Sequence, residues 1–135
     1  GNILVPFAVE SSLSGVQKEV GEKNELWYKR TFTVPSSWKG KDILLNFGAV
    51  DWKADVFVND ILIGSHTGGF TPFSLNITPY LNGKSTHKLV VRVWDPSDKG
   101  YQPRGYAGHR NLADRMAGAG RFLAYHLYQG DPEYR

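Results

Sequence analysis

The chain has 135 residues, a formal net charge of +3 and an apolar fraction of 41%, which suits one globular domain with a single core. Cysteine is absent, so disulfides and thiolate metal sites are excluded. No apolar run approaches the ~18 residues of a membrane span, and no nucleic-acid motif accompanies the mild basic excess. We therefore expect the chain to bind neither a membrane nor nucleic acid.

The residue pattern in the first half of the chain predicts β-strands. Residues 26–34 mix aromatic and β-branched side chains and end before Pro35. Over residues 42–50, a period of two places Ile43, Leu45 and Phe47 on one face.

Residues 54–58 and 61–65 flank Asn59 and Asp60, which suit a two-residue hairpin turn because both tolerate a positive φ. Apolar alternation resumes over 73–77 and 88–94. Short strands at this spacing, punctuated by Gly and Pro, predict an all-β sandwich or barrel. Within it we place Trp27 and Trp94 in the core, His66 in a turn bonded to backbone, and Gly68-Gly69 in a tight turn.

The end of the chain departs from this pattern. The spacing of the larger apolar residues favours a helix interrupted by Gly118 and Gly120; these residues are Leu112, Met116, Phe122, Leu123 and Leu127. A strand over residues 122–128 is the alternative.

A change of reading frame would account for that departure. The codons of Met116-Ala117, ATG-GCN, contain TGG one base later, which encodes tryptophan. Synonymous codons allow the run from Tyr106 to Arg121 to read Gly-Ile-Trp-Gln-Thr-Val-Trp-Leu-Glu within a strand-like sequence. We therefore predict that residues 106–135 are a frameshifted tail.

An ordered set of motifs connects residues 3–105 to a known family. The motifs are Val-Pro-Phe-Ala-Val-Glu-Ser at 5–11, Leu-Trp-Tyr-Lys-Arg at 26–30, Val-Asp-Trp-Lys-Ala at 50–54, Val-Asn-Asp at 58–60, Gly-Gly-Phe-Thr-Pro-Phe at 68–73 and Gln-Pro-Arg-Gly at 102–105. Together they resemble the N-terminal sugar-binding domain of family 2 glycoside hydrolases, which include β-galactosidases, β-glucuronidases and β-mannosidases. The resemblance implies a jelly-roll β-sandwich of the galactose-binding type over residues 1–105, lacking its first and closing strands, followed by a non-family tail over 106–135.

The resemblance also implies a function. In the family, both catalytic glutamates lie in a TIM barrel for which this chain has no room, so we expect a non-catalytic domain from a truncated retaining β-glycosidase, with no cofactor. The four histidines show no metal-ligand spacing. The residues that the resemblance places nearest the rim of the parent active site, and that we expect to contact carbohydrate, are Asp51, Trp52, Asp95, Asp98 and Arg104.

Two other function classes stay open. One is a free-standing carbohydrate-binding module, which would need an exposed aromatic platform. The other is an interaction module that forms homo-oligomers through an exposed sheet edge or through its tail. The sequence does not fix the compartment, although a periplasmic or secreted location is favoured over the cytoplasm.

Overall fold

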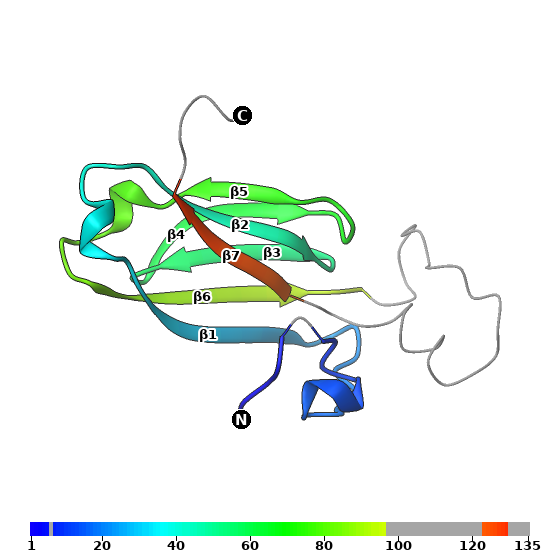
Figure 1. The fold of residues 1–135 in the computed structure, drawn as a ribbon. Helices are drawn as coiled ribbons and strands as arrows, with labels where there is room; N and C mark the ends of the chain where they lie inside the picture. Colours follow the sequence, from blue (N-terminus) through cyan, green and yellow to red (C-terminus); the bar gives the residue numbers. More distant parts are fainter. Residues whose placement is uncertain (6, 97–122, 130–135) are drawn as a thin grey trace.

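The computed structural model describes residues 1–5, 7–96 and 123–129, the last of these as backbone only. Its strands form two antiparallel sheets, with the orders β1-β6-β3-β4 and β5-β2-β7 (Figure 1). The strands are β1 (Glu25–Thr33), β2 (Ile43–Val50), β3 (Lys53–Val58), β4 (Ile61–Thr67), β5 (Phe73–Asn76), β6 (Thr86–Trp94) and β7 (Leu123–Gln129), and three single 3-10 turns are η1 (Ser12–Ser14), η2 (Ser36–Trp38) and η3 (Thr78–Tyr80). The predicted all-β sandwich is confirmed.

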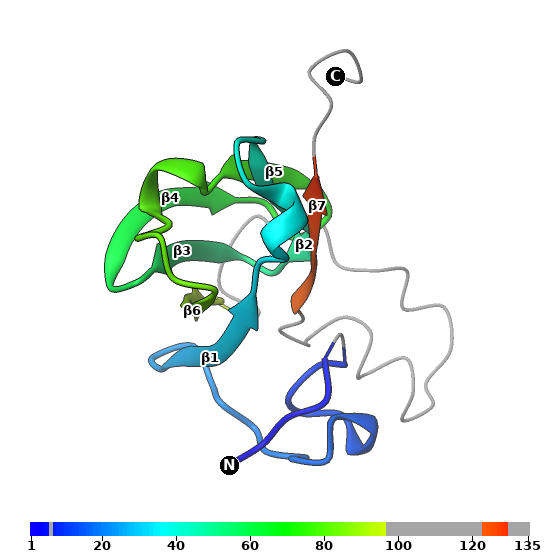
Figure 2. The same cartoon turned by 60° about the vertical axis from the view of Figure 1, so that its left-hand side comes forward.

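The two sheets face each other (Figure 2), and the core residues lie on their inner faces. The predicted inner face of β2 is confirmed, because Ile43, Leu45 and Phe47 are at most 2% exposed. Alternate residues of β3 and β6, such as Val56 and Val91, close the core from the other sheet. Burying a large aliphatic or aromatic side chain stabilises a fold by about 1.5–3 kcal/mol, so these alternating positions hold the layers together.

The hairpin between β3 and β4 has the predicted turn. Asn59 and Asp60 adopt φ values of 50° and 69°, the left-handed conformations that a type I′ turn requires. Asn59 also ties this turn to its surroundings, since its amide donates to the Tyr80 carbonyl and its oxygen accepts from the Lys88 amide.

The tail contributes a strand. β7 pairs antiparallel with β2 along its whole length, from Ile43 opposite Gln129 to Val50 opposite Leu123. The helix predicted from the spacing of Leu123 and Leu127 is therefore wrong over these residues, and the strand alternative holds. Pairing with a neighbouring strand overrides weak local spacing. The remainder of that predicted helix, residues 112–122, lies outside the described residues.

The connections gather at two opposite ends of the sandwich (Figure 1). At the right-hand end, the register brings together the end of β6, the start of β3 and the end of β4. At the left-hand end lie η2 and η3. No helix in the described part of the chain is long and apolar enough to cross a membrane.

Candidate functional site

Three of the five predicted rim residues meet at the right-hand end of the sandwich. Asp51 and Trp52 form the short connection between β2 and β3, and Asp95 directly follows β6. The Trp52 amide donates to the carbonyl of the last residue of β6 (N···O 3.3 Å), so the connection lies against the end of that strand. Asp98 and Arg104 lie outside the described residues.

These three residues differ in accessibility. Asp51 and Trp52 are partly exposed, whereas Asp95 is only 3% exposed. A side chain must reach solvent before it can contact a diffusing ligand. Asp51 and Trp52 are therefore the better placed to contact a sugar at this end.

The Asp51 carboxylate lies over Gly69 in the connection between β4 and β5. A β-carbon on Gly69 would stand 2.5 Å from Asp51 Oδ1, so a larger residue would displace the carboxylate. The neighbouring Gly68 has a φ of 124°, which favours glycine, and its amide donates to the Trp52 carbonyl (3.0 Å). The sequence predicted a turn here but not the contact with Asp51, because only the pairing of β3 with β4 brings positions 51 and 69 together.

His66 does not have its predicted role. It lies within β4, where its Nε2 is 3.0 Å from the Thr71 hydroxyl and its ring stacks on Phe73 at 4.2 Å between centroids. The prediction of a turn residue bonded to backbone is wrong, because the strand continues beyond residue 65 and directs this ring toward side-chain partners.

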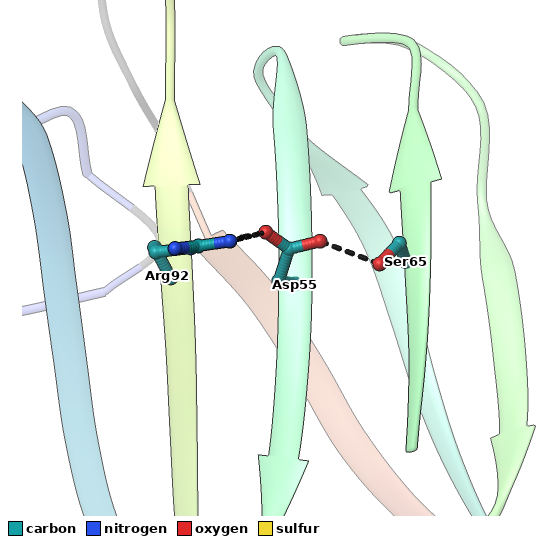
Figure 3. Close-up of polar contacts among 3 residues, drawn as sticks. All are labelled: Asp55, Ser65 and Arg92. Carbon is teal, nitrogen blue, oxygen red and sulfur yellow. Dashed lines mark hydrogen bonds and ion pairs between the residues drawn. The ribbon is translucent and has the colours of Figure 1, made fainter. Parts of the chain in front are cut away.

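A row of directly paired residues crosses the outer face of the four-stranded sheet, the face turned away from the core. Trp27 pairs with Arg92 across β1 and β6, and Asp55 pairs with Arg92 on one side and with Ser65 on the other. Asp55 Oδ2 accepts from Arg92 Nε (3.0 Å) and Nη2 (2.5 Å), and its Oδ1 accepts from the Ser65 hydroxyl (2.5 Å) (Figure 3). Strand register aligns these side chains.

Asp55 is an ionised carboxylate at neutral pH. Burial by itself would raise its pKa, but hydrogen bonds from Ser65 and Arg92, with the positive charges of Arg92 and Lys53, outweigh burial and hold the pKa of Asp55 below its usual value. A general acid in glycoside hydrolysis needs the opposite shift. The environment of Asp55 therefore suits an ion pair rather than proton donation.

Trp27 lies on this outer face and is 58% exposed, so its predicted place in the core is wrong. Its ring is 6.1 Å from that of Phe57 and 5.6 Å from the Arg92 guanidinium carbon. The prediction that Trp94 lies in the core is also wrong. Trp94 is partly buried on the same outer face, where its indole nitrogen donates to the Glu22 carbonyl (2.9 Å).

A small pocket lies in this outer face. It has a volume of about 240 Å³ and is lined by Glu25, Lys53, Asp55, Arg92 and Trp94. Its polar and aromatic lining is of the kind that reads sugar hydroxyls and ring faces. The residue types alone could not have predicted it, because its members come from β1, β3 and β6.

The described residues do not gather three or more His, Asp or Glu side chains around a point where a metal ion could bind. The two antiparallel sheets and the loops at their ends define a β-sandwich domain of the galactose-binding type. Residues 6–127 match the family described as "Glycosyl hydrolase 2 galactose-binding domain-like". The chain belongs to this family, and the resemblance seen in the sequence is confirmed.

Individual relatives agree with this assignment. The chain is 36% identical over 81 residues to a β-galactosidase of Thermoanaerobacter pseudethanolicus, an alignment that covers 59% of this chain and 11% of the relative. It is 35% identical over 77 residues to a β-glucuronidase of Paenibacillus borealis, with 55% and 13% covered. The chain thus spans about a tenth of the length of such relatives.

Solved structures give the same family. A Lactobacillus rhamnosus β-glucuronidase matches with a TM-score of 0.57 and 33% identity, over 67% of this chain and 15% of that one. A Ruminococcus gnavus β-glucuronidase matches with a TM-score of 0.58 and 27% identity, over 67% and 15%.

Proposed function

We propose that this chain is a non-catalytic, sugar-binding-type domain of a family 2 glycosidase. In this proposal the end of the sandwich that carries Asp51 and Trp52 contacts sugar, and the domain does not cleave the glycosidic bond. Retaining hydrolysis needs two carboxyl groups ~5 Å apart, one of them an acid with a raised pKa. Asp55, whose pKa is shifted the opposite way, is held by Arg92 and Ser65. This supports a structural role for the carboxylate in the sheet.

The parent activity belongs to the same proposal. Relatives of this chain carry the names β-galactosidase and β-glucuronidase, so we assign to the parent a retaining hydrolysis of β-glycosides such as β-galactosides. The catalytic carboxyl groups would lie in the nine tenths of such relatives that the chain does not span. Truncation by a frame change after residue 105 is part of this proposal.

The observation that carries the sugar-facing role is the arrangement of Asp51 and Trp52. Both are partly exposed. Backbone bonds to β6 and to Gly68 hold Trp52, and the Asp51 carboxylate lies over Gly69. A carboxylate beside an indole, fixed in this way, can accept from a sugar hydroxyl while the ring covers an apolar sugar face.

Two assays on the purified chain test the proposal. Incubation with nitrophenyl β-galactoside and nitrophenyl β-glucuronide should release no nitrophenol above buffer, since the proposal places the catalytic carboxyl groups outside this chain. Titration with galactose, followed by amide NMR, should shift the signals of Asp51 and Trp52, and Asp51→Ala should abolish those shifts. Turnover that survives repurification and is lost in a single carboxyl variant would overturn the non-catalytic assignment, and shifts confined to other surfaces would overturn the sugar-facing one.

The exposure of Trp27 favours a second candidate, a free-standing carbohydrate-binding module. Its ring stacks with Phe57, beside the pocket that holds Arg92 and Glu25. Binding of a neutral β-linked oligosaccharide that is lost in Trp27→Ala, with Asp51→Ala unchanged, would move this candidate to the front.

Self-association through a sheet edge is a third candidate. β4 ends one edge of the four-stranded sheet and begins with Ile61 and Leu62, which are 50% and 53% exposed. Unpaired edge strands with apolar side chains promote pairing with other chains. A molar mass that rises with concentration, and falls to the monomer value in Leu62→Lys, would support this candidate; a constant monomer mass would exclude it.

A further inference from the structure

A second pocket lies at the end of the sandwich opposite Asp51 and Trp52. It has a volume of about 440 Å³ and opens between the β1–β2 connection and the β5–β6 connection. This volume falls within the roughly 300–1,000 Å³ of pockets that hold small molecules.

Backbone contacts fix the two connections that form the pocket. The Ile43 amide donates to the Thr78 hydroxyl (2.8 Å), and the Val34 amide donates to the Ser85 carbonyl (3.0 Å). The pocket is therefore bounded by segments anchored to β1, β2 and β6, so its walls are supported by the sandwich.

One wall of the pocket is apolar. Trp38 and Leu81 line it and pack partly buried against the core, and Ile43, which is 2% exposed, forms its floor. An indole ring fixed at one side of a pocket offers a flat surface to the apolar face of a ligand ring.

The rim of the pocket is positively charged. Lys39, Lys41 and Lys84 line it and are exposed, and no Asp or Glu occurs among its described lining residues. Three lysines therefore line the pocket without a carboxylate among its described lining residues to neutralise them. This charge favours an anionic ligand.

His87 supplies a directed hydrogen-bond donor inside the pocket. The Asn59 side chain makes two hydrogen bonds to backbone: its nitrogen donates to the Tyr80 carbonyl, and its oxygen accepts from the Lys88 backbone amide. These bonds identify which end of the side chain is the NH₂ group. The amide nitrogen of Asn59 therefore donates to His87 Nδ1 (3.1 Å). In the neutral ring the proton must then sit on Nε2.

The His87 ring is 2% exposed and lines the pocket. The ring accepts a hydrogen bond at Nδ1 and stacks on Phe32 at 5.4 Å between centroids. In the part of the chain that the structure describes, no residue accepts from Nε2–H. A ring N–H at the wall of a pocket can donate to a ligand or to water.

We propose that this pocket binds a sugar ring that carries a carboxylate. The apolar face of the ring packs on Trp38, the carboxylate lies among the three rim lysines, and a hydroxyl or ring oxygen accepts from His87 Nε2–H. An acidic sugar has an apolar face for Trp38, an anionic group for the lysines and oxygen acceptors for His87. The inference goes beyond the proposed function and does not depend on it, because it concerns the other end of the domain.

Amide NMR of the full chain, titrated with two matched disaccharides, tests the proposal. Cellobiouronate and cellobiose differ by a carboxylate in place of a hydroxymethyl group. Cellobiouronate should shift the Trp38 indole signal and the amides of Lys39 and Lys84, and it should bind about tenfold more tightly than cellobiose, since charge is the difference between them. Equal binding of the two, or shifts confined to Trp27 or Trp52, would overturn the proposal.

Charge reversal supplies the matched variants. Lys39→Glu with Lys84→Glu should weaken cellobiouronate binding about tenfold or more, whereas Lys23→Glu with Lys29→Glu, which reverses two exposed lysines outside the pocket, should leave it unchanged. Equal effects of the two pairs would show only a general charge effect and would overturn the site. Sodium sulfate that produces the same Trp38 shift with the same affinity would reduce it to an anion site without sugar recognition.

Discussion

The ion pair between Asp55 and Arg92 gives a prediction that depends on its detailed geometry. Arg92→Met keeps most of the aliphatic stem but leaves the Asp55 carboxylate, 8% exposed, with Ser65 as the remaining partner of the network. Removing one partner of a buried pair costs about 3–5 kcal/mol. Arg92 is itself 36% exposed, so solvent reaches the site, and we expect a smaller loss of about 2–3 kcal/mol in the free energy of unfolding.

Asp55→Asn should cost less. The asparagine oxygen can accept from Arg92 at the Oδ2 position, and its amide can donate to Ser65 at the Oδ1 position, so both contacts survive without the charge. We expect a loss of about 1–2 kcal/mol.

Urea unfolding followed by tryptophan fluorescence measures both variants and the double variant. The expected order is a larger loss for Arg92→Met than for Asp55→Asn, with the double variant less destabilised than the sum of the two. If both single variants cost less than about 0.5 kcal/mol, as exposed ion pairs do, or if their losses add, the reasoning about burial and pairing at this network is refuted.

Three further predictions concern pH, close packing and the two faces of the sheets. Because the pKa of Asp55 is lowered in the folded chain, the stability that its charge contributes is present above the unfolded pKa of about 4 and is lost as pH falls through the folded pKa. The difference in unfolding free energy between the wild-type chain and Asp55→Asn should therefore narrow below about pH 4. A difference that stays constant down to pH 3 would contradict this. Gly69→Ala should destabilise the chain in urea unfolding by about 1–3 kcal/mol through its clash with Asp51 Oδ1, and adding Asp51→Ala should recover most of that loss; failure to recover it would place the strain elsewhere. Leu45→Ala, at a fully buried site, should lower the free energy of unfolding by about 2–5 kcal/mol. Leu62→Ala, at a site that is 53% exposed, should lower it by under about 1 kcal/mol. Similar losses for the two variants would mean that the buried and exposed faces of the sheets are wrongly assigned.

The sequence was most informative where one face of a strand is buried. Along β6 and the first part of β2, buried residues alternate with less buried ones, since one face meets the core and the other is turned away from it. The turn at Asn59 and Asp60 was equally readable, because its residue types match the φ values that the turn requires.

The position of Trp27 could not be predicted from the sequence pattern. In β1 the residues on both sides of it, Leu26 and Tyr28, are also apolar or aromatic, so a period of two does not say which set faces the core. β1 is an edge strand, and its outer aromatic packs on Phe57 rather than inside the sandwich. Composition could not separate these two outcomes.

The candidate sites were partly predictable for a similar reason. Asp51 and Trp52 were found because a sequence motif contains them, and the register then placed them together with the end of β6. The network of Asp55, Ser65 and Arg92 joins three strands that are distant in sequence, so it became visible only once the strand order was known. Lys39 and Lys84 meet at one pocket for the same reason.

We propose that this chain is one domain of a longer glycosidase. Sequencing the gene across the codons for residues 105–135 and onward tests that claim most directly. We predict that the shifted frame stays open and encodes further domains, including one with two glutamates suited to retaining hydrolysis. A shifted frame that closes soon after these codons, with the present frame intact, would contradict the account and would make the tail a genuine part of a small binding or interaction protein.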